Sequence, residues 1–145
     1  MNTGRAILLC PLLALLLCVA GFAADTVTCP RKIDVSQQLV AAAPGWTAMF
    51  DDTPHQLAGI SFYDGPPQEK ASLAYDNMTK AGAKQTAKWS FSPEASRETW
   101  ISCSYSGTSV KLAKTLPPKT TACEVTYDPR QQLAGLPLIE KISCR

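Results

Sequence analysis

Apolar and polar residues alternate with a period of two in two segments of the C-terminal half, 99–106 and 122–127. Each segment places one cysteine in phase with its large apolar residues: Ile101, Cys103 and Tyr105 in the first, and Cys123, Val125 and Tyr127 in the second. This alternation is typical of a β-strand with one buried face. The end of the chain repeats the pattern, with one phase formed by Leu136, Leu138, Ile142 and Cys144. The sequence therefore predicts three strands that direct cysteines into a common core.

Shorter segments with the same alternation occur at 32–39, 46–50, 56–63, 88–91 and 110–116. Most of the 11 prolines fall between the predicted strands, and Ser106-Gly107 predicts a tight hairpin. Residues 68–87 have no apolar stripe, so we expect a long exposed loop there with at most one helical turn. Residues 128–135 should connect the last two strands. About eight short strands predict an all-β fold, an antiparallel β-sandwich or flattened barrel. The three tryptophans alternate with polar neighbours and are expected in the core: Trp46, Trp89 and Trp100.

The first 23 residues have the anatomy of a secretory signal peptide. Arg5 supplies a positive start, residues 6–20 are almost all apolar, and a small-x-small pattern ends at Ala23. We expect cleavage after Ala23 or one residue later, which leaves 24–145 as a single secreted β domain. An uncleaved anchor would need about 20 apolar residues, and a lipoprotein signal would need a small residue before Cys18. The sequence therefore predicts an exported, soluble protein.

The charge pattern gives no sign of a nucleic-acid partner. The chain has 14 Lys and Arg against 12 Asp and Glu, a formal net charge of +2. No run of basic residues is interleaved with aromatic residues, as nucleic-acid binding would favour. We expect no membrane insertion once the signal peptide is removed.

Four cysteines remain after signal cleavage: Cys29, Cys103, Cys123 and Cys144. An even number in an oxidising compartment predicts two disulfides. Their wide spacing and the single histidine differ from zinc-binding patterns, so we expect neither a metal nor a cofactor. Three pairings are possible. We favour Cys103–Cys123 with Cys29–Cys144, because the second bridge would join the two ends of the domain.

No segment predicts catalysis. A nucleophilic hydroxyl or thiol needs a positioned base, and the serines at 106–109 lack the strand–turn–helix setting of a nucleophile elbow. His55 lies in a polar turn, where a solvated side chain is usual. Asp51 and Asp52 are adjacent, so on a strand they would point to opposite faces. We expect a protein that is not an enzyme, and a hydrolase that uses Asp51, Asp52 or Glu69 is the less favoured alternative.

The segment Tyr63-Asp-Gly-Pro-Pro-Gln-Glu69 is a candidate contact surface. Its prolines stiffen the backbone, which lowers the entropy cost of binding, and tyrosine is enriched at interface hot spots. The structural alternative is that Tyr63 closes the core edge and the prolines end a strand. With the turn at 51–55, the candidate partner-binding residues are Asp51, Asp52, His55, Tyr63, Asp64 and Glu69.

The motifs as a set resemble a family of small exported proteins of Gram-negative bacteria. The resemblance is carried by Cys29-Pro30 before Ile33-x-Val35, Gly45-Trp46, Ser61-Phe-Tyr-Asp-Gly-Pro-Pro67, Ala71-Ser-Leu73, Trp100-x-x-Cys103-x-Tyr105, Leu116-Pro117, Cys123-x-Val125-x-Tyr127 and Ile142-Ser-Cys144. Some members lie in type VI secretion loci, which implies periplasmic immunity proteins that neutralise a cell-wall-modifying effector, such as an L,D-transpeptidase-like enzyme. The resemblance implies no site residues.

The residues and the resemblance agree on a periplasmic protein that acts by binding. We favour an inhibitor or immunity protein whose partner is a peptidoglycan-modifying effector. The alternative is an envelope-associated structural or peptidoglycan-binding protein.

Overall fold

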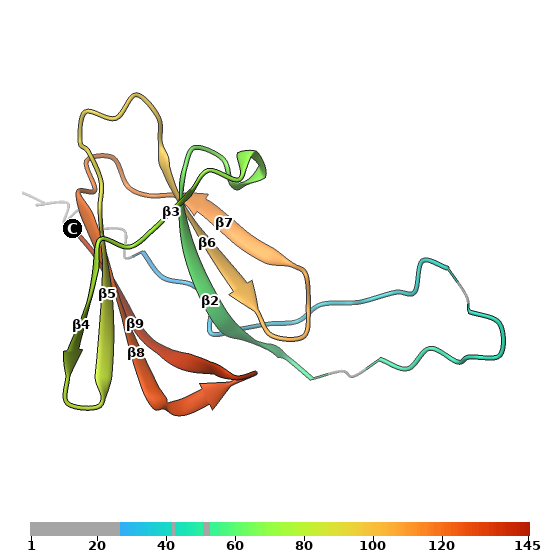
Figure 1. Ribbon diagram of the computed structural model, residues 1–145. Coiled ribbons are helices and arrows are strands. Elements are labelled where there is room, and N and C mark those ends of the chain that lie inside the picture. Colours follow the sequence, from blue (N-terminus) through green and yellow to red (C-terminus); the bar gives the residue numbers. More distant parts are fainter. Residues whose placement is uncertain (1–26, 42, 51–52) are drawn as a thin grey trace, which may run out of the picture.

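The computed structural model describes residues 27–41, 43–50 and 53–145, and within them two antiparallel sheets pack face to face (Figure 1). The strands are β1 (Lys32–Ile33), β2 (His55–Asp64), β3 (Ser72–Leu73), β4 (Asn77–Ala81), β5 (Lys84–Ser90), β6 (Thr99–Tyr105), β7 (Lys111–Thr115), β8 (Ala122–Leu133) and β9 (Leu136–Cys144). A short 3-10 helix, η1 (Pro67–Glu69), follows β2. The predicted signal peptide lies outside the described residues.

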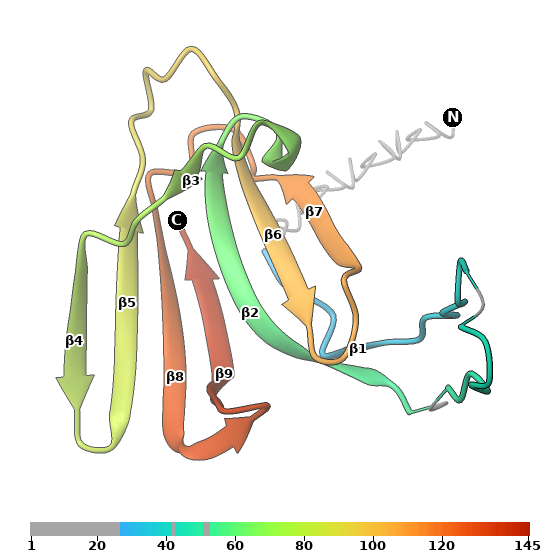
Figure 2. The ribbon, with the colours of Figure 1, turned by 45° about the vertical axis from the view of Figure 1, so that its right-hand side comes forward.

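The first sheet has the order β1-β2-β6-β7, with β3 also paired to β2, and the second has the order β4-β5-β8-β9. Figure 2 shows the second sheet as one layer and β2, β6 and β7 as the other. The described residues form two open sheets rather than a closed barrel, which confirms the predicted β-sandwich. The same part of the chain holds no helix with the length and hydropathy of a membrane span.

The core lies between the two layers. Its largest fully buried side chains are Phe62, Ile101, Cys123, Val125 and Ile139. The Phe62 ring centroid lies 4.9 Å from that of Trp89 and 5.5 Å from that of Phe91, so aromatic contacts link the sheets. The predicted phases of β6 and β8 are confirmed, because each phase is turned towards this core.

The hairpin formed by β4 and β5 replaces much of the long loop predicted at 68–87. Every residue of β4 is exposed. An edge strand with two solvated faces needs no apolar alternation, so the sequence carries no pattern by which to recognise it. Gly82 at φ 60° begins the two-residue turn, where a positive φ suits glycine.

The strands predicted at 32–39 and 46–50 are wrong except for the two residues of β1. Lys32 and Ile33 pair with the first two residues of β2, and beyond them the chain leaves the sheet. Trp46 is 83% exposed, so its predicted place in the core is also wrong. Trp89 is buried as predicted, and Trp100 is half-buried.

The long hairpin of β8 and β9 includes most of the connection predicted at 128–135. Ala134 and Gly135 form its turn, with φ angles of 51° and 79°. Thr126 pairs with Lys141 while Tyr127 pairs with Ile139, which leaves one extra residue in β9. This β-bulge reverses the inward phase. Ile139 is therefore buried while Leu136, predicted to point inward, is exposed.

Two disulfides form as predicted, but the favoured pairing is wrong. Cys29 bonds Cys103 with a Cα separation of 5.9 Å, and Cys123 bonds Cys144 with a Cα separation of 4.1 Å. Cys103 and Cys123 lie on strands of different sheets, whereas Cys123 and Cys144 are direct partners in the β8–β9 ladder. The pairing follows from sheet topology, which cysteine spacing alone does not reveal.

Candidate functional site

The predicted partner-binding residues lie at opposite ends of β2. His55 begins the strand and Asp64 ends it, so about 30 Å of extended chain separates them. Tyr63, Asp64 and Glu69 lie together at the far end. Asp51 and Asp52 lie outside the described residues. The structure therefore offers two separate surfaces where the sequence suggested one.

Arg97 organises the surface at the far end of β2. Its guanidinium donates to the Glu69 carboxylate, and its Nε lies 3.9 Å from Asp64 Oδ1. The hydrogen bond and charge of Glu69, with a smaller contribution from Asp64, raise the pKa of Arg97 above its ordinary value. The two predicted acidic residues thus share one basic partner. Sequence reasoning did not identify Arg97, because it comes from the distant loop between β5 and β6.

The backbone of the 64–70 loop is shaped by this contact. Gly65, at φ 90°, donates its N–H to the Glu98 carbonyl at 3.0 Å, and any side chain at this position would collide with the Arg97 guanidinium. η1 and Lys70, at φ 61°, then turn the chain back into β3. The loop is therefore packed against the 97–98 segment in a defined conformation.

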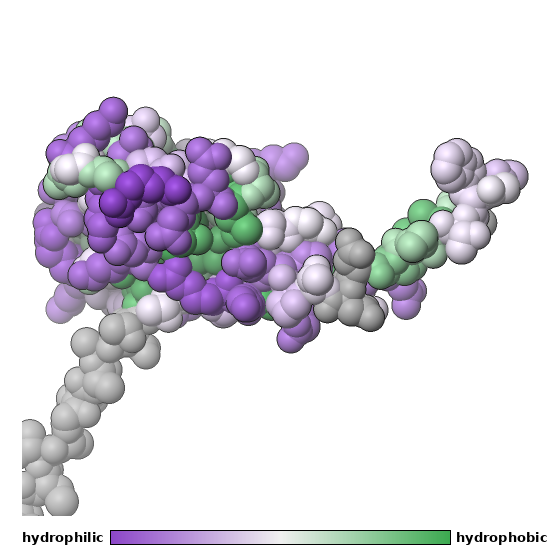
Figure 3. All heavy atoms as spheres, turned by 90° about the horizontal axis from the view of Figure 1, so that it is seen from below, coloured by the Kyte–Doolittle hydropathy of each residue, from purple (hydrophilic) through white to green (hydrophobic). Residues whose placement is uncertain are grey.

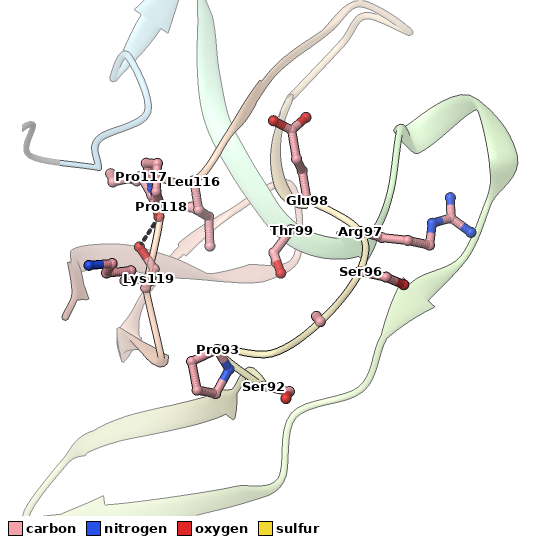
Figure 4. Close-up of a pocket in the computed structure, with 12 residues that line it drawn as sticks. Ser92, Pro93, Ser96, Arg97, Glu98, Thr99, Leu116, Pro117, Pro118 and Lys119 are labelled. Atoms are coloured by element: carbon pink, nitrogen blue, oxygen red, sulfur yellow. Dashed lines mark hydrogen bonds between the residues drawn. The ribbon is translucent and has the colours of Figure 1, made fainter.

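A pocket of about 240 Å³ lies beside this loop, between residues 92–99 and 116–120. Figure 4 shows Arg97 reaching away from the pocket towards the loop that follows β2. Thr120 Oγ1 donates to the Pro117 carbonyl at 2.7 Å and closes the opposite wall. The cavity is smaller than the roughly 300–1,000 Å³ usual for small-molecule sites. We therefore assign it no ligand.

His55, the first residue of β2, is buried, whereas the sequence predicted a solvated turn residue. Its Nδ1–H donates to the Ser106 carbonyl at 2.7 Å. Gln37 Nε2 lies 3.4 Å from His55 Nε2 and donates to the Gly107 carbonyl at 3.3 Å. The imidazole therefore joins the β6–β7 turn to the segment that follows β1. That turn is distant in sequence, so the local residues gave no sign of this burial.

Residues 34–41, 43–50 and 53–54, called the arm below, run away from both sheets (Figures 1 and 2). Figure 3 shows the arm leaving a largely hydrophilic body, with green atoms along part of its length and white to pale purple atoms at its tip. Val35, near its start, is half-buried, and five large apolar side chains farther along are more than half exposed: Leu39, Val40, Trp46, Met49 and Phe50. Gly45, at φ 79°, helps turn the chain, where the Trp46 N–H donates to the Ala43 carbonyl at 3.1 Å. A cleft of about 600 Å³ separates its base from the body.

The chemistry of both surfaces suits contact with another molecule. The surface at the end of β2 presents a tyrosine beside ion-paired side chains, and the arm presents exposed apolar side chains. Within the described ranges no three His, Cys, Asp or Glu residues come close enough together to hold a metal ion.

Comparison with known protein families gives a match over most of the chain. The family described as "Type VI secretion system Tli immunity protein" matches residues 52–145, which is more than half of the chain. No curated protein and no solved structure matches. The matched region starts shortly before β2 in the sequence and includes every described strand except β1.

Proposed function

The chain belongs to the Type VI secretion system Tli immunity protein family, and we propose that it protects its own cell by binding an effector enzyme in the periplasm and blocking its action on the cell wall. The family match is the observation that carries this proposal. An immunity protein of this kind binds a protein effector and inhibits it without chemistry of its own.

The periplasmic location is supported by the N-terminal sequence. Arg5, the apolar run at 6–20 and the small residues ending at Ala23 fit a cleaved signal peptide. The two disulfides suit an oxidising compartment. An inhibitor stationed there meets effectors that act on the envelope, and the cell wall is the target we favour.

We propose that the loop at Tyr63 to Glu69 forms part of the contact surface. Arg97 and the Gly65–Glu98 hydrogen bond hold the loop in place before a partner arrives. A preformed loop loses little conformational entropy on binding. Tyr63 lies at the start of the loop and is half-buried. Its ring contributes amphipathic contact area next to charged groups.

The first experiment is a pull-down with the oxidised mature protein as bait. Periplasmic extract and the protein products of the neighbouring genes serve as prey. We expect one stoichiometric effector that degrades or modifies peptidoglycan, with its activity lost in the complex. An effector that acts on another envelope component would contradict the cell-wall assignment. An empty lane, together with sedimentation of the protein with purified sacculi, would instead favour a peptidoglycan-binding role.

The contact surface is tested with Tyr63→Ala and Asp64→Ala. Each should weaken effector binding by about tenfold, the usual scale for an interface anchor, and leave the melting temperature nearly unchanged. Asp76→Ala is the matched control, since Asp76 is an exposed aspartate outside the 63–69 loop. Equal affinity of all three variants and the wild type would remove this loop from the interface.

A further inference from the structure

The arm is a second surface, separate from the Tyr63 loop, that is suited to contact with the effector. We propose that its apolar end inserts into a recess on the effector protein and serves as a main anchor of the complex. This inference rests on the proposed function, since it names the element that makes the contact. Apart from residues 53–54, the arm precedes the family match, which begins at residue 52, so this contact would add to whatever the matched region supplies.

The exposure of the arm is costly unless another molecule covers it. Met49 is 91% exposed and Trp46 is 83% exposed, while the described residues place no other part of the chain over them. Methionine and tryptophan are enriched in the buried centres of protein interfaces, and tryptophan is prominent among hot-spot residues. Their position on a projecting segment gives a convex surface, which fits a concave partner better than a flat one.

The charge pattern favours a protein partner over a lipid surface. No charged residue occurs between Asp34 and Asp51. Segments that dock on anionic membranes carry lysine or arginine beside their apolar residues. This segment instead has aspartates at both ends, Asp34 on one side and Asp51-Asp52 on the other, which would be repelled by anionic lipid. Depletion of charge is the pattern of an interface core.

Both ends of the arm are fastened to the body. On the N-terminal side, Cys29 is bonded to Cys103 and β1 pairs with the start of β2. Gln37 then connects the arm to the Gly107 carbonyl and lies beside His55, which begins β2 on the C-terminal side. These attachments fix where the arm leaves the body, and less orientational freedom is lost when it binds.

The inference is tested by measuring the affinity of arm variants for the purified effector encoded by a neighbouring gene. Trp46→Ala should weaken binding by about tenfold or more and Met49→Ala by a smaller factor, while Trp46→Phe should retain most of the affinity. Met78→Ala is the matched control, because Met78 is also exposed but lies on β4 in the second sheet. All four variants should melt at the wild-type temperature.

The outcomes separate this inference from the proposed function. If wild type binds the effector and the arm variants bind equally well, the arm is not an anchor, although the immunity role stands. If wild type does not bind any neighbouring effector, the proposed function fails and the inference fails with it. Binding of wild type to vesicles of phosphatidylethanolamine and phosphatidylglycerol that is lost in Trp46→Ala would assign the arm to lipid. A wild-type dimer that Trp46→Ala converts to a monomer would assign it to self-association.

Discussion

Tyr105 ends β6 with its ring buried, and its hydroxyl has no hydrogen-bond partner among the described residues. Burial raises the pKa of this phenol. A buried polar group without a partner costs about 1–3 kcal/mol. We expect Tyr105→Phe to raise the free energy of unfolding by up to about 1 kcal/mol, measured by urea denaturation. A clear loss of stability would mean that the hydroxyl is satisfied, for example by a bound water.

Asp128 is a buried carboxylate that accepts three hydrogen bonds from Arg130: from the backbone N–H and Nε at 3.1 Å each and from Nη2 at 3.0 Å. These bonds hold the pKa of Asp128 at about 2, below its ordinary value of 3.8. The ionised form therefore favours the folded state. Its contribution is complete above the unfolded pKa and is lost as pH falls from about 4 to about 2.

We therefore expect Asp128→Asn to lower the free energy of unfolding at neutral pH, with the difference from wild type shrinking near pH 2. Urea denaturation at the two pH values measures this change. Exposed Asp76→Asn is the control and should show little effect at either pH. A deficit in Asp128→Asn that is the same at both values would contradict the role given to the charge.

The orientation of a residue could be predicted where it follows from the local sequence pattern. It could not be predicted where it depends on contacts with a distant part of the chain. The inward positions of Ile101, Cys103 and Val125 followed from alternation alone. The burial of His55 depends on the β6–β7 turn, and the role of Arg97 depends on a loop about thirty residues away from its partners. The candidate acids at 64 and 69 were found by sequence, but their shared cation was not.

The two disulfides act on different elements and should differ in their effect on stability. Cys29–Cys103 closes 74 residues and joins the chain before β1 to β6, whereas Cys123–Cys144 closes 21 residues within one hairpin. The chain-entropy relation gives about 4.5 kcal/mol for the longer loop and about 3.3 kcal/mol for the shorter. Replacing both Cys29 and Cys103 with serine should therefore lower the free energy of unfolding more than replacing both Cys123 and Cys144.

Urea denaturation of the two double variants measures this order. Loss of the first disulfide should also loosen the base of the arm, which increased proteolytic cleavage within 34–54 would report. Equal stability losses, or a larger loss for the hairpin disulfide, would contradict the loop-length argument. The wild type under reducing conditions should be less stable than either variant.

Element prediction succeeded where a strand has one buried face. β2, β6, β7 and the first half of β8 were all found near their actual bounds. Alternation did not predict β4, which is exposed on both faces. It wrongly predicted strands in the arm, whose alternating apolar residues have no sheet to pack against. Alternation indicates that a segment could form a half-buried strand. Whether the strand forms depends on whether another strand is available to pair with it.

At the scale of the whole molecule, β2 carries the two proposed contact regions at its opposite ends. Tyr63 and its loop lie at one end, and the arm joins the other through His55. The length of β2 places about 30 Å between the Tyr63 loop and the base of the arm. A partner that meets both must be large, as a folded effector is and a short glycan fragment is not. Composition and charge predicted no nucleic-acid partner, whereas the distance between the two regions could be found only from the fold.

The disulfide connectivity also bears on how the protein matures. If the chain is exported to the periplasm as proposed, it enters from its N-terminus, and its cysteines arrive in the order 29, 103, 123 and 144. The first two to arrive are native partners, and so are the last two. Oxidation of Cys103 with Cys29, and then of Cys144 with Cys123, would therefore produce the correct bridges directly, without the slow reshuffling that interleaved pairs require. An immunity protein with this connectivity would reach its disulfide-bonded form soon after its last residues had crossed the membrane.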